Sequence, residues 1–453
     1  MFKYLLAPRY RKKLSKWFFE TENWKKNDWR NWVAEEFERI KASEWTLRNF
    51  PDLKNYSFED LVTYPINEKY AEAPKCFPSV FQYTSSGTFD KKTIKLSRND
   101  GRKLLRAVMR IVWLWKGEDS FKRGLLFGFP GLISGEVAEY VGYIFLRDML
   151  FVHGGSWRLY IDKIIEKAPY DVIFSVMPYV IDFWKNFKEN IYTDPTFVIC
   201  GGDILTDYIR NLIIDTASAF GKVVYPIDIY AASETTWLGS EIPPQVVKSL
   251  LHVPETHVAL IHKEDGTLVN IFDAKPGDRG ELIVTPLFDY TVPNYNLRDV
   301  IEILSDETPL GLPSFRVLGR KGQIIEIELS TIGYIKGVYS ALMRVKGMNI
   351  NCFEFTNLLG EKFGTDHFSL IYEKEDKVIM NTYVEKSIDQ DKLLNSIAEN
   401  DKINYMYDDI KSGMLQLNII VDPEVLQEVR RIYYERYSGQ ASIPRCVLVK
   451  KEE

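Results

Sequence analysis

A run of small hydroxyl residues around a glycine is the first place where this chain could do chemistry. Residues 84–88 read Thr-Ser-Ser-Gly-Thr, and Lys91 and Lys92 follow shortly after. Such a loop can offer backbone N–H groups and hydroxyls to phosphate oxygens, while lysines neutralise phosphate charge. The G-x-x-x-x-G-K-[ST] spacing of a Walker A loop is absent. The stretch therefore predicts a phosphate loop of another type, although a polar surface loop has the same composition.

A glutamate that follows an apolar segment is the second candidate. Residues 228–236 read Asp-Ile-Tyr-Ala-Ala-Ser-Glu-Thr-Thr, at the end of a strand predicted at 223–229. Ligands of open α/β sheets bind beyond the carboxyl ends of strands, and one carboxylate can hold Mg²⁺ whose other ligands are phosphate and water. Glu234 is therefore a candidate magnesium ligand. A Ser-Glu pair after a strand is also typical of a helix cap.

Two further stretches extend the set. Residues 293–299 follow a strand predicted at 281–285, and a buried Asp299 could accept hydrogen bonds from two ribose hydroxyls. Gly319 and Arg320 lie where the composition shifts towards the C-terminal part of the chain. Each stretch is weak by itself, but the order and separation of all four indicate a nucleotide site.

The elements that must position these residues form an α/β pattern. Continuous apolar strands that alternate with amphipathic helices predict a largely parallel sheet. Beyond residue 320, short strands alternate with charged helices, which is typical of a smaller α+β domain. We expect an N-terminal domain at 1–319, with a helical segment at 1–74, and a C-terminal domain at 320–453. The apolar strands are expected at 124–129, 172–176, 197–200 and 223–229, and the helices at 135–150, 206–219, 390–400 and 423–437.

Composition excludes several classes of protein. The 453 residues are 45% hydrophobic, which predicts two or more cores, and a net charge of −5 argues against a nucleic-acid binder. Cys76, Cys200, Cys352 and Cys446 form no CxxC pair, which argues against a zinc cluster or a disulfide framework. No apolar stretch reaches the about 18–20 residues of a membrane span, and no secretory signal is visible. We therefore expect a cytoplasmic protein.

The aromatic and histidine patterns have simpler structural interpretations. Residues 1–50 are basic and rich in tryptophan, so a helix there could lie on a membrane surface. Packing of these tryptophans on the main domain is the simpler interpretation. His252, His257 and His262 recur every five residues, a spacing that does not favour a metal site. His153, after a predicted helix, is a candidate for an acyl pocket.

Together the four stretches resemble the adenylate-forming superfamily, which includes acyl-CoA synthetases and luciferases. Residues 84–92 are similar to its phosphate loop, and 230–234 to its Tyr-Gly-x-Ser/Thr-Glu motif. Residues 280–285 with 294–299 are similar to its Gly-Glu-Leu and Arg-Tyr-x-x-Gly-Asp region, and Gly319-Arg320 to its hinge. The spacing is similar to that of phenylacetate–CoA ligases. Tyr-Ala-Ala-Ser-Glu and the ending Ile-Pro-Arg-Cys-Val resemble plant acyl acid–amido synthetases.

This resemblance implies the ligands ATP and Mg²⁺ and a role for each matched residue. The residues so implied are Thr84, Ser85, Ser86, Gly87 and Thr88, with Lys91 or Lys92, for the β- and γ-phosphates; Gly201, Gly202 and Asp203 beside adenine; Tyr230 stacked on the base, with Ser233 in the same motif; Glu234 for Mg²⁺; and Asp299, with Arg320 nearby, for the ribose.

The sequence departs from the family pattern at several of these places. Phe89-Asp90 stands where the family usually has Thr-Gly, and Arg298 stands where a glycine usually precedes the ribose aspartate. The mobile catalytic lysine of the family has Gln440 in its place. Lys450 or Lys451 could replace it, or Lys91 and Lys92 could carry the charge.

The resemblance implies ATP-dependent activation of an aromatic or other hydrophobic carboxylic acid to an acyl-adenylate, with release of pyrophosphate. Coenzyme A is the expected acyl acceptor, and an amine or a protein thiol is the alternative. A nucleotide-binding regulatory module without turnover is a further alternative, which Gln440 favours and the intact loop and Glu234 oppose. No G-x-G-x-x-G follows a predicted strand, so a Rossmann dehydrogenase is set aside. A homodimer is compatible with the sequence.

Overall fold

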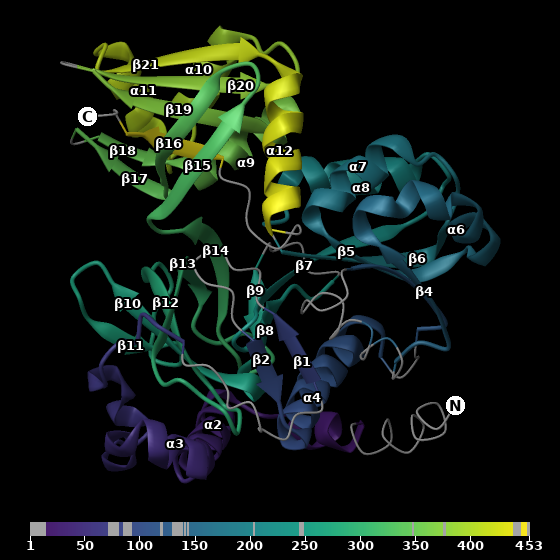
Figure 1. Cartoon of the computed structure of the whole chain (residues 1–453), viewed down its shortest axis with the longest axis vertical. Helices are drawn as coiled ribbons and strands as arrows, with labels where there is room; N and C mark the ends of the chain where they lie inside the picture. Colours follow the sequence, from purple (N-terminus) through teal and green to yellow (C-terminus); the bar gives the residue numbers. More distant parts are fainter. Residues whose placement is uncertain are drawn as a thin grey trace. The chain divides into compact units, whose positions relative to one another are not determined.

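The chain divides into two compact units in the computed structural model (Figure 1). The first contains Met1–Gly202, Ile213–Leu297 and Ile301–Val317, and the second contains Asp203–Leu212, Arg298–Val300 and Leu318–Glu453. The structure describes residues 15–70, 81–84, 93–117, 121–128, 139, 142, 145–202, 204–243, 249–346, 348–374, 377–437 and 445–450.

A 12-stranded sheet forms the centre of the first unit, in the order β11-β10-β12-β13-β14-β9-β8-β7-β6-β5-β3-β4. The strands from β4 to β7 pair in parallel. Antiparallel pairs follow from β7 to β8, β8 to β9 and β9 to β14, and β10 pairs antiparallel with both β11 and β12. The α/β prediction is therefore confirmed, with an antiparallel half in addition. The strands are β3 (Arg123–Gly128), β4 (Asp148–His153), β5 (Tyr170–Val176), β6 (Tyr192–Gly201), β7 (Val224–Ala232), β8 (Thr236–Ser240), β9 (Leu250–His252), β10 (His257–Lys263), β11 (Leu268–Asn270), β12 (Arg279–Pro286), β13 (Tyr295–Ser305) and β14 (Ser314–Arg320).

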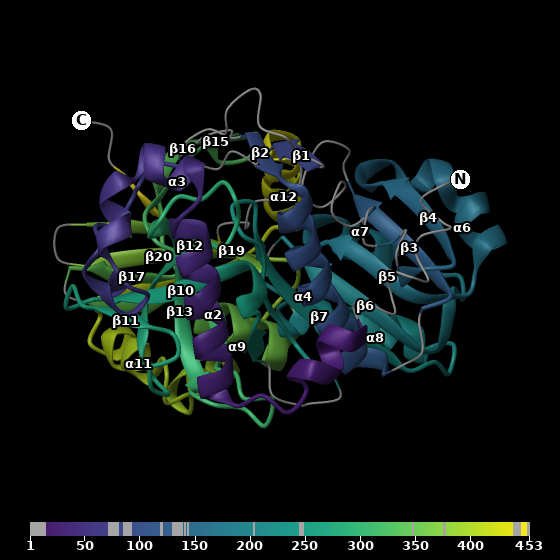
Figure 2. The ribbon, with the colours of Figure 1, turned by 90° about the horizontal axis from the view of Figure 1, so that it is seen from below.

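Helices cover this sheet, and a separate hairpin joins β1 (Phe81–Thr84) to β2 (Thr93–Leu96). Figure 2 shows α2 running along the β10–β12 region, and α2 packs on β10. The helices are α2 (Lys26–Lys41), α3 (Glu44–Asn49), α4 (Arg98–Lys116), α6 (Ile161–Lys167), α7 (Met177–Asn186) and α8 (Asp207–Ser218).

One predicted helix ends earlier than expected. The helix predicted at 135–150 overlaps Asp148–Leu150, which belong to β4 and pair in parallel with β3. Backbone pairing with β3 therefore overrides helical periodicity at this end. His153 consequently ends a strand rather than following a helix, and its side chain lies outside the described residues.

The N-terminal tryptophans pack inside the first unit. Trp17 contacts the rings of Trp24, Trp29 and Trp32 with centroid distances of 5.3–6.3 Å. The guanidinium of Arg110 on α4 lies 4.8 Å from the Trp29 ring centroid, a cation–π contact. This packing agrees with the simpler interpretation of the basic, aromatic N-terminus. Among the described residues, no helix is long and apolar enough to cross a membrane.

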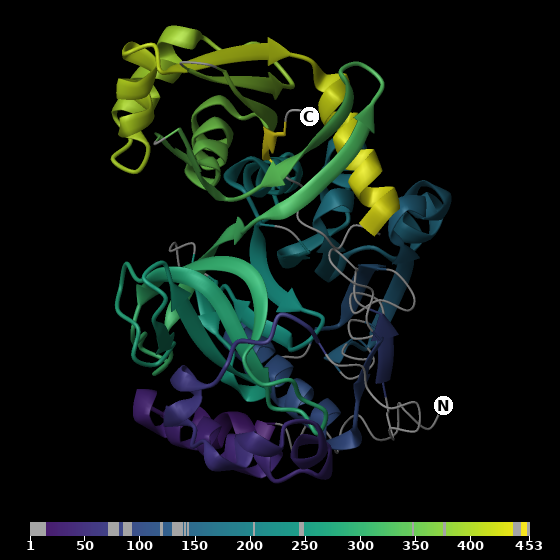
Figure 3. The ribbon, with the colours of Figure 1, turned by 60° about the vertical axis from the view of Figure 1, so that its left-hand side comes forward.

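The second unit is built on a six-stranded sheet in the order β15-β16-β22-β19-β20-β21. The last strand, β22, is interior and pairs antiparallel with β16 and parallel with β19. Figure 3 shows the long β15–β16 hairpin with α12 beside it. The elements are β15 (Gln323–Leu329), β16 (Gly333–Tyr339), β17 (Leu342–Val345), β18 (Met348–Asn351), α9 (Cys352–Phe363), β19 (His367–Glu373), β20 (Val378–Val384), α10 (Gln390–Ala398), α11 (Asn404–Lys411), β21 (Leu415–Val421), α12 (Pro423–Tyr437) and β22 (Cys446–Val449).

Candidate functional site

Glu234 lies in the tight turn that joins β7 to β8. Ala232 pairs with Thr236 across this hairpin, and the N–H of Thr235 donates to the carbonyl of Ala232 at 3.2 Å. The helix-cap interpretation of the Ser-Glu pair is therefore wrong, because an antiparallel strand follows the turn. Glu234 is 9% exposed, so its carboxylate is largely removed from bulk water.

The residues after Glu234 have two unusual features that sequence reasoning missed. Thr236 has φ = 67°, a left-handed conformation that costs a residue with a Cβ about 1–2 kcal/mol. The hydroxyls of Thr235 and Thr236 are buried and make no hydrogen bond within the part of the chain that the structure describes. Mg²⁺ prefers oxygen ligands such as carboxylates, so the Glu234 carboxylate in this turn suits the role of a magnesium ligand.

The carboxyl end of β6 lies beside this part of β7. Cys200 pairs with Asp228, so the next residues, Gly201 and Gly202, lie across from Ile229 and Tyr230. A Cβ added at Gly201 would lie 3.1 Å from Ile229, and Gly202 has φ = 88°, which favours glycine. The first unit therefore brings the two predicted adenine-side glycines near the Tyr230–Glu234 stretch.

Tyr230 does not lie in open solvent in this arrangement. Its ring meets that of Phe315 edge to face, with centroids 6.2 Å apart. Phe315 itself is buried, so it supports one side of the tyrosine ring. Asp203, the third residue predicted beside adenine, lies outside the described residues.

The predicted phosphate loop connects the two strands of a hairpin. Thr84 ends β1 and pairs with Thr93, the first residue of β2. Ser85, Ser86, Gly87, Thr88, Lys91 and Lys92 lie outside the described residues, as does the side chain of Thr84.

In the second unit, Asp299 and Arg320 form an ion pair. The Nε of Arg320 donates to Asp299 Oδ1 at 2.8 Å, and Asp299 is 6% exposed. The N–H of Lys321 donates to the carbonyl of Arg298 at 2.9 Å. These bonds tie the Arg298-Asp299 dipeptide to the end of β14, so the predicted ribose ligand has a fixed position in this unit.

Arg298 takes the conformation that glycine would take. Its φ is 60°, in the left-handed region. Sequence reasoning identified the missing glycine before Asp299 as a departure, and the structure shows that arginine adopts the left-handed backbone instead. Among the described residues, the non-glycine residues with positive φ are Thr236, Asn294, Arg298 and Lys346. The first three lie in stretches that the sequence singled out, and such strain clusters at functional sites.

Lys450, a predicted catalytic residue, directly follows β22. Its backbone N–H donates to the carbonyl of Lys336 at 2.8 Å, and its side chain is exposed. Gln440 and Lys451 lie outside the described residues. Because β22 is an interior strand, a deletion that begins before Cys446 would remove part of the sheet, so a point substitution is the cleaner test of Lys450.

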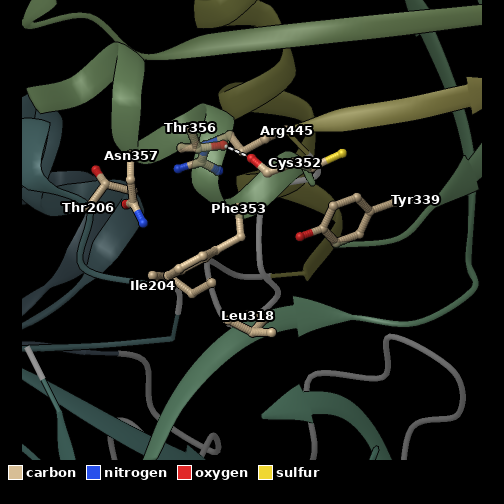
Figure 4. Close-up of a pocket in the computed structure, with 9 residues that line it drawn as sticks. All are labelled: Ile204, Thr206, Leu318, Tyr339, Cys352, Phe353, Thr356, Asn357 and Arg445. Carbon is tan, nitrogen blue, oxygen red and sulfur yellow. Dashed lines mark hydrogen bonds between the residues drawn. The ribbon is translucent and has the colours of Figure 1, made fainter. Parts of the chain in front are cut away.

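A small cavity in the second unit is lined by Tyr339, Cys352, Phe353, Thr356, Arg445 and their neighbours (Figure 4). Its volume is about 20 Å³, enough for one water rather than a substrate. Burial by itself would raise the pKa of Asp366, but Arg445 and Arg430 hold that pKa well below its usual range. The Nε of Arg445 lies 3.1 Å from Asp366 Oδ1, so this ion pair holds the arginine in the core of the second unit.

His252 and His257 lie side by side in the core of the first unit, with ring centroids 5.0 Å apart. Burial lowers the pKa of His252 to about 3 and that of His257 well below its usual value, so both rings are neutral at pH 7. Within the described ranges, no group of three His, Cys, Asp or Glu residues could hold a metal.

Solved structures with this fold include adenylate-forming enzymes. A 2-hydroxyisobutyryl-CoA ligase, in the postadenylation state with 2-HIB-AMP, has a TM-score of 0.61 and 14% identity over 92% of this chain and 94% of the other. The AtGH3.15 acyl acid amido synthetase, in complex with 2,4-DB, has a TM-score of 0.58 and 13% identity over 98% and 94%. ATP-bound MatB from Rhodopseudomonas palustris has a TM-score of 0.50 and 15% identity over 79% and 68%.

These likenesses confirm the predicted fold: the chain has the architecture of adenylate-forming enzymes. No protein-family model matches the sequence, and no curated protein matches it.

Proposed function

We propose that this protein activates a carboxylic acid with ATP, forms an acyl-adenylate with release of pyrophosphate, and transfers the acyl group to coenzyme A. The observation that carries the proposal is the shared fold over nearly the full length of a CoA ligase solved with an acyl-AMP. The Glu234 turn and the Asp299–Arg320 pair support it, because they provide a carboxylate for Mg²⁺ and a fixed ribose acceptor.

The reaction requires charge neutralisation more than acid–base chemistry. A carboxylate oxygen of the acid forms a bond to the α-phosphorus of ATP, and the bond from that phosphorus to the β-phosphate oxygen breaks. Because both reactants are anions, positive charge must surround the phosphates. We assign this role to Lys91, Lys92 and Lys450, with the hydroxyl and N–H groups of residues 84–88 orienting the phosphates.

The motif matches assign a role toward the nucleotide to several residues. Tyr230 would stack on the base, with Gly201, Gly202 and Asp203 beside it and Ser233 in the adjoining turn. Asp299, held by Arg320, would accept the ribose hydroxyls. When bound, Mg²⁺ offsets charge on the phosphates, and Glu234 would be its protein ligand.

We propose that the acid is aromatic or otherwise hydrophobic. The spacing of the motifs supports an enzyme of the phenylacetate–CoA ligase type. An amine is the second candidate acceptor. The observation that favours it is the likeness to an acyl acid amido synthetase, which covers 98% of this chain. We propose a cytoplasmic location, which fits the free thiols of Cys200, Cys352 and Cys446.

Exchange of labelled pyrophosphate into ATP tests the proposal, with a panel of aryl, indolyl and fatty acids. We expect exchange that requires both an acid of the panel and Mg²⁺. Product analysis with coenzyme A, and separately with amino acids, then distinguishes a thioester from an amide. Folded protein that binds ATP but shows no exchange with any acid would overturn adenylation and favour the regulatory module.

A further inference from the structure

A short helix at residues 15–21 packs on α4 in the first unit and keeps one face towards solvent (Figure 2). Its inward side chains include Trp17 and Phe18, which are both buried. Its outward side chains include Lys16, whose side chain is 77% exposed, and Phe19, which is 48% exposed. The packing of the tryptophan therefore leaves a cation and an aromatic ring on the solvent side of this helix.

The α4 residues beside this helix have the same character. The ring of Phe19 meets that of the half-buried Trp113 edge to face, with centroids 5.2 Å apart. The guanidinium of Arg106 lies 4.8 Å from the Trp17 ring centroid. Arg102 is exposed and shares one face of α4 with Arg106 and Trp113, because four and then seven residues separate them. Neither arginine forms an ion pair with any described residue.

We call these residues the α4 surface. Its members are Lys16, Phe19, Arg102, Arg106 and Trp113. One acidic residue partly offsets its charge, because Glu20 pairs with Lys16 at 3.3 Å between Oε1 and Nζ. Both side chains of this pair are largely exposed, so the pair is weak and the surface stays basic.

The sequence just before this helix adds a large positive charge. Residues 1–19 contain six basic residues and no acidic residue, whereas the whole chain has a net charge of −5. The six basic residues are Lys3, Arg9, Arg11, Lys12, Lys13 and Lys16. Apolar residues such as Phe2, Leu5 and Leu6 lie between them in the sequence. Residues 1–14 lie outside the described residues, and their charge is known from the sequence alone.

Basic charge beside exposed aromatic rings suits the surface of an anionic lipid bilayer. Lysine and arginine are attracted by negative lipid headgroups, and aromatic and leucine side chains enter the boundary between headgroups and acyl chains. A nucleic acid would attract the same charge, but its phosphate backbone offers no apolar layer for Leu5, Leu6 and Phe19. The combination therefore favours a membrane over a nucleic acid.

We propose that the α4 surface, with the basic residues that precede it in the sequence, binds this protein reversibly to anionic phospholipid membranes. The cations lie against the negative headgroups, and the Phe19 ring enters the headgroup layer. This is peripheral binding without a membrane span. It goes beyond the proposed reaction and does not depend on it.

Sedimentation of the whole chain with lipid vesicles tests the proposal. We expect binding to vesicles of mixed phosphatidylcholine and phosphatidylserine, and none to vesicles of phosphatidylcholine alone. Binding should fall as salt is raised, because salt screens the attraction. Replacement of Arg9, Arg11, Lys12 and Lys13 by glutamine should weaken binding about 10²–10³-fold, since each cation near the surface contributes about fivefold.

Two point variants test the described part of the surface. Arg102→Glu should weaken binding to the mixed vesicles about tenfold or more, because it reverses a charge. Phe19→Ser should weaken it about tenfold, because less apolar area enters the lipid. Lys188→Glu and Leu159→Ser are the matched controls, since both residues are exposed in the same unit on elements other than α4. Both controls should bind as the wild type does, and equal melting temperatures would show that all four variants fold.

The outcomes that would overturn the inference are distinct. Wild-type protein that does not bind the mixed vesicles would overturn it, as would unchanged binding by the variant without the four cations. Equal affinity for single-stranded DNA, with unchanged vesicle binding by Phe19→Ser, would show a general polyanion surface and also overturn it. Pyrophosphate exchange without vesicles is a separate measurement, so failure of the membrane proposal leaves adenylation standing.

Discussion

The two predicted ligand carboxylates are held in different ways. Glu234 lies in a turn between paired strands of the first unit, and the two threonines that follow it have buried hydroxyls that make no hydrogen bond with described residues. Asp299 lies within β13 and accepts a 2.8 Å hydrogen bond from Arg320. Asp299 is therefore oriented by a protein cation before any ligand binds. Glu234 instead owes its place to a hairpin turn that is set by the pairing of β7 with β8.

Substitution of Glu234 should have the largest effect on the reaction. Glu234→Gln keeps the size of the side chain but removes the charge proposed to hold Mg²⁺, so pyrophosphate exchange should fall about 10²–10³-fold. Exchange rates at several Mg²⁺ concentrations would measure this. Glu264→Gln, in an exposed turn of the same unit, is the control. Wild-type exchange in Glu234→Gln would remove this residue from the site.

Substitution of Asp299 should have a smaller effect, confined to nucleotide affinity. Asp299→Ala removes the proposed acceptor of the ribose hydroxyls, so ATP binding should weaken by about 1–3 kcal/mol. Calorimetric titration with ATP would measure the change, with circular dichroism to show that the fold is intact. Asp401→Ala, exposed in the same unit, is the matched control. Unchanged affinity for ATP would contradict the ribose assignment.

The smallest effect is expected at Thr235, in stability rather than activity. Thr235→Val keeps the shape of a fully buried side chain and removes a hydroxyl that has no hydrogen-bond partner among the described residues, so the free energy of unfolding should rise by up to about 1 kcal/mol. Urea denaturation of the ligand-free protein would measure this.

Thr356→Val in the second unit is the contrasting control for Thr235. Thr356 Oγ1 donates to the carbonyl of Cys352 at 2.6 Å and lies 2.9 Å from His367 Nε2. Removal of this satisfied hydroxyl should lower stability by about 1 kcal/mol or more, because a buried partner is left unpaired. A loss of stability in Thr235→Val as well would show that its hydroxyl has a partner in the folded protein.

The sequence by itself determined the α/β class, the positions of the parallel strands β3, β5, β6 and β7, and the stretches that carry polar residues. Apolar runs such as 197–200 are continuous because both faces of a parallel strand are buried, and this leaves a local signal. The order of motifs along the chain was equally visible, because it depends on residue types and spacing alone. The roles of the individual site residues stay predictions until the variants are measured.

Only the tertiary structure decided how these residues are held. Ser233–Thr235 form a hairpin turn because β8 pairs with β7. The residue types of this turn do not distinguish a hairpin from the start of a helix. The strand at Asp148–Leu150 depends likewise on its pairing with β3. The left-handed backbone of Thr236 and Arg298 could not be predicted, because local propensity favours glycine or asparagine there. Long-range hydrogen bonds impose these conformations, such as that from Lys321 to Arg298, and no sequence window contains both ends of such a bond.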